Sequence, residues 1–376
     1  MTIVFDCFKF VKGTGKSIGI YNLTLNLIRN LAADNQSAGN HDKLIVLGNK
    51  HNREDFDIPG VTFVTVKYNP LNKIICILWE LVLVTTALKR IKPDIAVFSR
   101  GFAPLKWLYK GKTYVIIHDM IPFYYDKNYP GVLNKYENAY IMNRLKASAR
   151  SATGVIAVSE YSKNDIVRIA KVPADKVHVI YNGINLIDKV NDVTSISPDI
   201  LGGAALPKDY ICAVCSGLPH KNAEGVIKSY DAYYKSSNAP IDIVIIGIEN
   251  TDEYSPDAEV KKHIRCIRYI GDNEDMYGVI KGSRLFWFLS RQEGFGFPPL
   301  EAMQLGVPVI CSNASSLPEI VGNAAVLVDP EDHHAVAGNT VQMLSEDNSM
   351  LVKAGYENVK NFLWEKQVKE YKKVLR

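Results

Sequence analysis

Two glutamates lie eight positions apart where a glycine-rich loop leads into a predicted helix. The apolar run 285–289 leads into residues 290–306, which contain Gly294 and Gly296, two prolines and a final glycine. This order predicts a strand, a loop and a proline-started helix. The two loop glycines let backbone N–H groups approach a phosphate closely. We expect Glu293 in the loop, facing a ligand. Glu301 falls in the first turns of the helix, where an ordinary solvated position is the alternative.

Lys221 stands where a predicted strand gives way to a glycine turn and a helix. The sequence runs through Cys215, Gly217 and His220 before it reaches Lys221. A helix N-terminus presents unpaired N–H groups and a partial positive charge, and a lysine adds a full charge. The pattern favours an anion site, with a plain surface lysine as the alternative.

His118 ends the apolar run 114–117 and precedes a proline loop and the aromatic residues 123–125. A histidine in this place can hydrogen-bond a substrate hydroxyl or help to bind a reacting group. A strand-end cap satisfied by the backbone is the alternative.

A glycine turn also follows the first apolar run, with Gly13, Gly15 and Gly19 ahead of a predicted helix. It is not a triphosphate P-loop, because Phe10 stands where that motif needs its first glycine. Its spacing misses the dinucleotide fingerprint by one residue. A flexible turn that approaches a ligand and simple turn chemistry both remain open.

Other chemistry-bearing residues predict no site. Cys212 and Cys215 lie within one predicted strand and point to opposite faces, so core packing is expected rather than a metal or redox site. His333 and His334 open a polar helix and are expected to be solvated. Six dispersed cysteines favour a reduced, cytoplasmic chain, and the first residues do not resemble a signal peptide.

The elements that position these residues alternate between apolar runs of strand length and patterns of helical period. Such alternation over 376 residues predicts two α/β domains with parallel sheets. The pattern pauses around residues 183–208, which are rich in Gly, Asp, Asn, Ser and Pro. We therefore expect an amino-terminal domain over 1–185, a linker over 186–206 and a second domain over 207–360.

Net charge and hydropathy limit the kinds of molecule that the chain is expected to bind. The net charge of +4 is far from that of a dedicated nucleic-acid binder but suits phosphorylated small molecules. The longest apolar stretch, 74–88, is too short to cross a bilayer, contains Glu80 and is expected to form a buried helix. A predicted helix carrying Lys135, Arg144, Lys146 and Arg150 either touches anionic lipid at the inner membrane face or is simply solvated.

Residues 293–303 resemble the E-x7-E motif of the retaining GT-B glycosyltransferases, in particular the large family four of nucleotide-sugar enzymes. Further segments that match this family in order are 158–162, 179–184, 217–222, 309–319 and 329–331. The resemblance covers most of the chain. It implies two Rossmann-like domains facing a central cleft, acceptor-binding first and donor-binding second, with residues 361–376 as a helix returning to the first domain.

The resemblance also implies roles. Lys221 would neutralise the donor diphosphate, Glu293 would hold hydroxyls of the transferred sugar, Glu301 would accept hydrogen bonds from the ribose, and His118 would lie near the sugar. His220 departs from the family, since many members carry arginine there, so part of the leaving-group charge would be met differently or depend on pH. The implied catalytic residues are His118, Lys221 and Glu293, and the implied donor-binding residues are Gly15, Gly19, Gly217, His220, Lys221, Gly294, Phe295, Gly296 and Glu301.

The expected reaction moves a hexose, with mannose favoured, from a GDP- or UDP-linked sugar to a glycan or lipid-linked glycan of a surface polysaccharide. Residues 118–122, 79–80 and 159–162 are similar to those of bacterial mannosyl- and rhamnosyltransferases. Configuration would be retained, and neither a metal nor another cofactor would be needed. A nucleotide-sugar epimerase on the same scaffold and a non-catalytic binding subunit are the alternatives.

Overall fold

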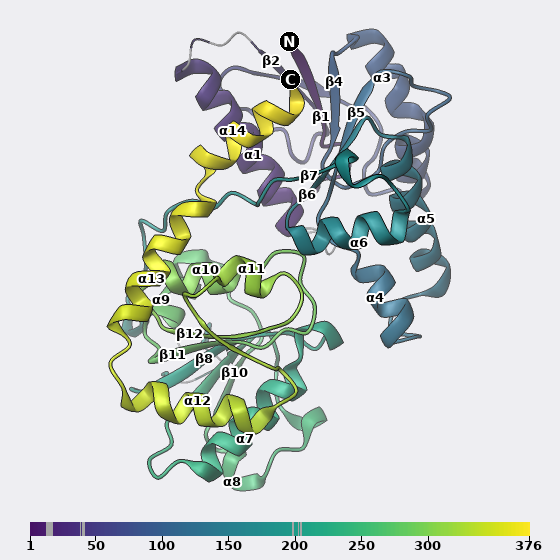
Figure 1. The fold of residues 1–376 in the computed structure, drawn as a ribbon. Helices are drawn as coiled ribbons and strands as arrows, with labels where there is room; N and C mark the ends of the chain where they lie inside the picture. The colour runs from purple at the N-terminus through teal and green to yellow at the C-terminus, as the bar shows by residue number, and fades with distance from the viewer. Residues whose placement is uncertain (13–17, 38, 40–41, 198, 202, 204) are drawn as a thin grey trace. The chain divides into compact units, whose positions relative to one another are not determined.

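The computed structural model describes residues 1–376 except 13–17, 38, 40–41, 198, 202 and 204. The predicted turn at Gly13 and Gly15 therefore lies outside the described residues. The chain forms two compact units, which are described separately (Figure 1). The N-terminal unit contains residues 1–184 and 362–376, and the C-terminal unit contains residues 185–361.

The N-terminal unit is built on a seven-stranded parallel sheet in the order β3-β2-β1-β4-β5-β6-β7. Figure 1 shows α1 and α14 on the side of this sheet opposite to α3 and α5. The strands are β1 Thr2–Asp6, β2 Lys43–Gly48, β3 Val61–Thr65, β4 Ile95–Phe98, β5 Lys112–Ile117, β6 Gly154–Ala157 and β7 Val177–Val179. The principal helices are α1 Ile18–Ser37, α2 Lys73–Leu78, the π-helical η1 Trp79–Leu83, α3 Val84–Ile91, α4 Ile121–Asn128, α5 Lys135–Ser151 and α6 Glu160–Ala170.

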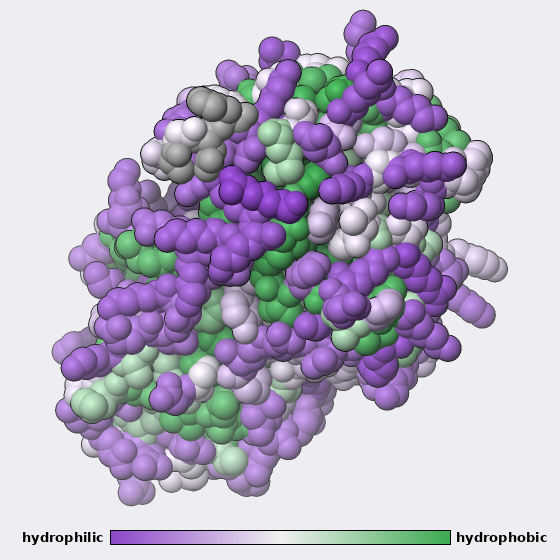
Figure 2. All heavy atoms as spheres, turned by 45° about the horizontal axis from the view of Figure 1, so that its top comes forward, coloured by the Kyte–Doolittle hydropathy of each residue, from purple (hydrophilic) through white to green (hydrophobic). Residues whose placement is uncertain are grey.

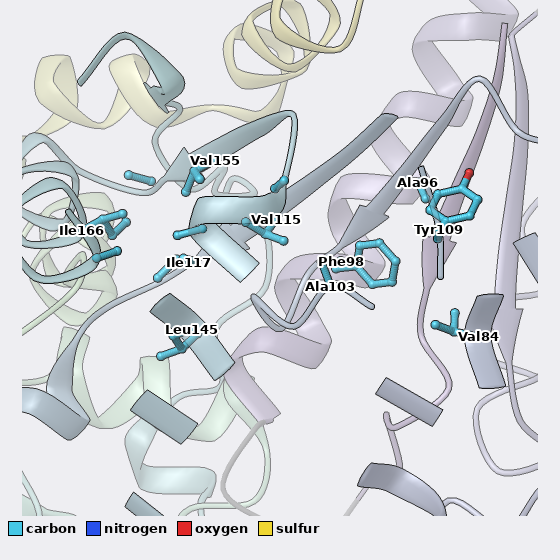
Figure 3. Packing of buried hydrophobic residues seen from close by; sticks show 14 of the residues in the cluster. Val84, Ala96, Phe98, Ala103, Tyr109, Val115, Ile117, Leu145, Val155 and Ile166 are labelled. Carbon is cyan, nitrogen blue, oxygen red and sulfur yellow. The ribbon is translucent and has the colours of Figure 1, made fainter. Parts of the chain in front are cut away.

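Alternate residues of the strands form the core beneath α3, α5 and α6. Val115 and Ile117 of β5 point to one face, where Leu145 of α5 lies within the same buried cluster (Figure 3). Ile166 of α6 and Val84 of α3 belong to this cluster as well. Both faces of a parallel sheet must be covered in this way, because its strands carry apolar residues on each side. Because the strands run parallel, their carboxyl ends lie at the same end of the sheet, and the turns that follow them lie close together there.

Residues 73–91 form α2, η1 and α3 in direct succession, so the helix expected over 74–88 is present but only one side of it is buried. Trp79 and Val84 are buried, but Ile74, Leu78 and Val82 point to solvent with 70, 43 and 38% of their surfaces exposed. A helix on the outside of a sheet can bury only one side of its 3.6-residue period. Among the described residues, no helix combines the length and apolar content that a bilayer-spanning segment needs.

The C-terminal unit repeats the design with a six-stranded parallel sheet in the order β10-β9-β8-β11-β12-β13. Strand β10 escaped sequence prediction because it is a half-exposed edge strand with charged neighbours. The strands are β8 Tyr210–Val214, β9 Asp242–Ile246, β10 Ile264–Ile267, β11 Leu285–Phe288, β12 Val309–Ser312 and β13 Val326–Val328. The helices include α7 Ala223–Ser236, α8 Ala258–Lys261, α9 Asn273–Lys281, α10 Phe297–Gln304, α11 Leu317–Val321, α12 His333–Ser345 and α13 Ser349–Val359.

Helix α14, Trp364–Leu375, belongs to the N-terminal unit although it ends the chain. It packs beside α1, and Lys372 forms an ion pair with Asp34 of that helix. At its start, Ile184 and Leu363 form a parallel β-bridge, and the ring of Trp364 lies against Gly183. The C-terminal segment 362–376 is thus held to residues 1–184 by apolar contact and by an ion pair.

Substitution of Gly183 tests this tie. A Cβ at Gly183 would lie 2.1 Å from Cδ2 of the buried Trp364 ring, so Gly183→Ala should lower the free energy of unfolding by about 1–3 kcal/mol. Gly338→Ala is the matched control, since its Cβ meets nothing within 4 Å in α12, and it should stabilise by up to about 1 kcal/mol. Chemical denaturation measures both, and equal effects of the two substitutions would contradict the packing of α14.

Figure 2 gives the surface view, in which apolar patches interrupt a mostly hydrophilic surface on the face shown. A few exposed apolar side chains are normal for any protein, but extended clusters of them call for an explanation.

Candidate functional site

In the C-terminal unit the strand order places the turn after β8 next to the turn after β11. Strand β8 has β9 on one side and β11 on the other, so the turns after β8 and β11 leave toward opposite faces of the sheet. In open parallel sheets, ligands bind outside the carboxyl ends of the strands at such a switch point. Lys221 follows β8 and Glu293 follows β11, so both predicted site residues lie there.

Asn222 fixes the turn after β8. It adopts a left-handed backbone with φ of 58°, and its Oδ1 accepts a hydrogen bond from the N–H of Gly225 to cap α7. Its Nδ2 donates to the carbonyl of Leu289 over 3.0 Å, beyond the end of β11. Lys221 therefore projects from a short 3-10 turn that is anchored to both strands.

The loop after β11 is held from below by two serines. The N–H of Glu293 donates to Ser315 over 3.0 Å, and the hydroxyl of Ser316 donates to the carbonyls of Glu293 and Phe295. Gly296 has a φ of 122°, which side chains rarely tolerate. The ring of Phe295 is buried 5.0 Å from that of Phe297, so Phe295 anchors the loop and could offer a ligand only its backbone.

Lys221 and Glu293 form an ion pair. Lys221 Nζ lies 2.7 Å from Glu293 Oε1, and the two side chains retain 29 and 11% of their exposure. A partly buried pair of this kind is held by its charges, yet one face of the lysine still reaches solvent. The site therefore presents a cation and a carboxylate side by side, which suits a ligand with an anionic part and a hydroxyl-bearing part.

His220 cannot add positive charge near neutral pH. It is buried beside Lys221, and burial followed by the neighbouring lysine charge lowers the pKa of its imidazole to about 4. The imidazole is therefore neutral where the usual arginine would be charged. Without a bound ligand, His220 therefore contributes no charge that varies with pH near pH 7.

Arg291 is the residue that sequence analysis missed. Its guanidinium binds Glu331 through Nε and Nη2 over 2.5 and 3.1 Å, and Nη1 donates to the carbonyl of Pro219 over 3.1 Å. The backbone N–H of Arg291 also donates to the carbonyl of His220. Arg291 thus clamps the two turns together. Its place beside Glu293 was a signal, but its partner Glu331 lies forty residues later in the chain.

Glu301 is set apart from the ion pair, on α10. Within the described part of the chain its carboxyl group makes no hydrogen bond or ion pair, and burial raises the pKa of that carboxyl to about 7. Solvated placement, the alternative for this residue, is thereby disfavoured. A half-buried carboxylate without a partner is an acceptor ready for hydroxyl groups, which would stabilise its charged form.

The N-terminal unit has its own switch point between β1 and β4. Beside it lies a cavity of about 700 Å³, lined by His118 after β5, Lys9 after β1 and Arg100 after β4. His118 Nε2 donates to the carbonyl of Ser99 over 3.0 Å, and burial lowers the imidazole pKa to about 4. The imidazole is therefore neutral, with Nδ1 unprotonated and able to accept a hydroxyl hydrogen.

Buried charges surround this cavity, and sequence analysis did not identify them. Lys9 pairs with Glu80 over 2.5 Å, and Tyr140 donates to the same carboxylate. Arg100 lies near them, with its buried Nε making no hydrogen bond in the described residues. Asp6 accepts from Trp79, and burial raises its pKa to about 6. These side chains come from β1 and the turn after it, from η1, from the turn after β4 and from α5, so only the tertiary fold brings them together.

The other predicted positions vary. Gly19 is exposed in the first turn of α1, where a Cβ would meet nothing within 4 Å. Arg144 does not face lipid, because it is buried and donates to the carbonyl of Ala103. Lys135 and Arg150 are exposed and Lys146 half-buried. His333 was expected to be solvated, but it is half-buried beside Ser229. Cys212 and Cys215 are buried in the core, as predicted.

The raised pKa of Glu301 makes a stability prediction. Because burial raises the pKa of the folded-state carboxyl above its ordinary value of 4.5, its burial costs no stability well below pH 4.5, and the cost is complete above pH 7. Glu301→Gln should therefore raise the free energy of unfolding at pH 8 more than at pH 5, by on the order of 1–2 kcal/mol. Glu346→Gln, at an exposed position, is the control. A pH-independent difference would refute the buried carboxyl.

Comparisons with known proteins agree with this architecture. Residues 19–187 match the model "Glycosyltransferase Family 4", and residues 203–360 match "Glycosyl transferases group 1". O-antigen chain mannosyltransferase B of Escherichia coli is 29% identical over 60% of this chain and 61% of its own length. O-antigen chain mannosyltransferase RfbU of Salmonella typhimurium is 27% identical over 66% of this chain and 67% of its own length.

Solved structures show the same fold. Anabaena Alr3699/HepE in complex with UDP-glucose superposes with a TM-score of 0.65 at 16% identity, covering 100% of this chain and 99% of that one. Its likeness, with that of the glycosyltransferase from Rickettsia africae at a TM-score of 0.62, establishes two Rossmann-like domains of the GT-B kind. With one family model matching each half, the chain belongs to the glycosyltransferases, as a family 4 domain followed by a group 1 domain.

Proposed function

We propose that this glycosyltransferase moves a mannosyl unit from a nucleoside diphosphate sugar to a glycan acceptor during assembly of a surface polysaccharide. The observation that carries the proposal is the Lys221–Glu293 ion pair at the switch point of the C-terminal unit. Support for mannose and for an O-antigen acceptor comes from the names of the two similar mannosyltransferases. A GDP-linked donor is favoured over a UDP-linked one for the same reason.

The main barrier to such a transfer is the charge that develops on the departing diphosphate. Lys221 and the N-terminus of α7 supply positive potential where that charge would appear. When the diphosphate reaches Lys221, it competes with Glu293 for the ammonium group. The freed carboxylate can then accept hydroxyl groups of the sugar, so donor binding exchanges one ion pair for two new contacts. Glu301 would accept hydrogen bonds from the ribose.

Retention of configuration follows if the acceptor attacks from the face that the diphosphate leaves. The bond from the anomeric carbon to the phosphate oxygen breaks, the bond to the acceptor oxygen forms on the same face, and the leaving phosphate takes the hydroxyl proton. In this scheme the Glu293 carboxylate is occupied by sugar hydroxyls, and His118, whose pKa is lowered to about 4 by burial, carries no proton to donate as an acid near neutral pH. Neither residue is therefore assigned the nucleophile or acid role of a hydrolase. No metal is required in this scheme.

Separate substitutions of the ion pair divide the two roles. Lys221→Met should weaken binding of GDP or UDP, whereas Glu293→Gln should leave that binding within about threefold and still reduce transfer by about a hundredfold or more. Calorimetry measures nucleotide binding, and release of nucleoside diphosphate from the nucleotide sugar measures transfer.

Lys228 and Glu224, an exposed ion pair on α7, provide the matched controls Lys228→Met and Glu224→Gln. Both control variants should bind and transfer normally. The assignment fails if Lys221→Met binds the nucleoside diphosphate as tightly as the unaltered protein does.

Substitution of Gly217 tests whether this position is needed for donor binding but not for folding. A Cβ there would meet only Tyr254 Oη at 3.9 Å, so Gly217→Ala should change unfolding free energy by less than about 0.5 kcal/mol. If the backbone approaches the diphosphate closely, donor affinity should still fall by about tenfold, or 1.4 kcal/mol. Thermal shift with nucleotide sugars measures both quantities.

Gly247→Ala is the contrasting variant, because its Cβ would lie 1.9 Å from the carbonyl oxygen of Cys215 at a φ of 110°. That substitution should destabilise the unit with or without ligand. Unchanged donor affinity in a fully stable Gly217→Ala protein would remove Gly217 from the donor site.

A further inference from the structure

A row of large apolar side chains projects outward from one segment of the N-terminal unit. We name this row the outer α2 face. Each member exposes between 38 and 70% of its surface. The members are Tyr68, Leu71, Ile74, Ile77, Leu78 and Val82.

The arrangement of the outer α2 face is not that of a water-facing helix. Leu71, Ile74, Leu78 and Val82 recur every three or four residues, which places them along one side of α2 and η1. The opposite side of the same segment is apolar too, and it buries Trp79 against the sheet. A helix between a core and water should be polar on its outer side, so an apolar outer side calls for an explanation other than contact with water.

Within residues 67–92, which carry the outer α2 face, the exposed charges are all positive. The only acidic residue in the sequence between positions 67 and 92 is Glu80, and it is buried and paired with Lys9. The exposed basic side chains of the segment form no ion pair in the described part of the chain; they are Lys67, Lys73, Lys89, Arg90 and Lys92. Basic residues beside an anionic bilayer are attracted to its negative surface potential.

The outer α2 face borders the cavity of the N-terminal unit. Leu71 and Ile77 belong to the face and also line the 700 Å³ cavity that contains His118 and Arg100. An apolar surface with basic flanks thus runs directly into a polar cavity. A molecule held in a bilayer by its apolar part could place its polar part in this cavity without leaving the membrane.

We propose that the outer α2 face docks on an anionic lipid bilayer and so presents the cavity to a lipid-linked acceptor. The surface suits insertion of side chains into the headgroup region, as in interfacial amphipathic helices, rather than passage across the bilayer. The part that concerns the acceptor rests on the proposed transferase function, whereas lipid binding does not. A second copy of this chain is the other occupant that an apolar face could take.

Vesicle binding tests the proposal. The full chain should sediment with vesicles of phosphatidylcholine and phosphatidylglycerol, bind pure phosphatidylcholine vesicles at least tenfold more weakly, and lose binding as salt increases. Ile74→Ser with Leu78→Ser should weaken binding at least tenfold, because neither residue lines the cavity and both are exposed. Lys67→Gln with Lys73→Gln should weaken binding to the anionic vesicles alone.

Two further measurements complete the design. Met350→Ser with Tyr356→Ser removes exposed apolar side chains from α13 and should leave binding unchanged. Ile74→Trp places a fluorophore on the outer α2 face, and its emission should shift to shorter wavelength when anionic vesicles are added. No vesicle binding by the unaltered chain, or no shift from Ile74→Trp, overturns the proposal.

The remaining outcomes separate this proposal from the others. A dimer that Ile74→Ser with Leu78→Ser dissociates, without vesicle binding, would assign the face to a second copy and overturn the proposal. Release of nucleoside diphosphate from a nucleotide sugar with a water-soluble oligosaccharide should be unaffected by that double substitution. If the unaltered chain binds vesicles but releases no nucleoside diphosphate, the transferase function is contradicted and the lipid binding is not.

Discussion

The contact between Lys221 and Glu293 is the interaction on which the account depends. It joins a turn that follows β8 to a loop that follows β11, at the place where the sheet reverses its direction of winding. Each charge alone would be costly in so enclosed a position, and together they are stable while no ligand is present. Under the proposed function, an incoming anion would meet a lysine that is already positioned, and its arrival would free a carboxylate beside it.

The surrounding structure keeps this pair in place without taking part in it. Arg291 fastens the two turns to each other and to Glu331, and Asn222 ties the first turn to the end of β11. Ser316 holds the carbonyls of the glutamate loop from beneath. These contacts leave the two turns little freedom to move. The turns are thus held by an arginine that is already paired and by the neutral side chains of Asn222 and Ser316. The charge available to a ligand is left to Lys221.

Sequence patterns predicted much of this because strands, helices and glycine turns are local. Lys221, Glu293 and Glu301 fall where strand ends and helix starts could be recognised, and both parallel sheets follow from alternation. The rest depends on distant neighbours. The partner of Arg291 is forty residues away, the burial that lowers the pKa of His220 is tertiary, and the cluster of Lys9, Glu80 and Arg100 assembles from three separate elements. The apolar content of residues 74–88 could not reveal which side of the helical segment would be exposed to solvent.

The most direct measurement of the central claim is a crystal structure of the protein with an intact nucleotide sugar bound. The account predicts that Lys221 Nζ moves from Glu293 to a diphosphate oxygen and that the Glu293 carboxylate accepts hydroxyl groups of the sugar. A bound donor whose diphosphate lies away from Lys221, with the ion pair to Glu293 still formed, would contradict it.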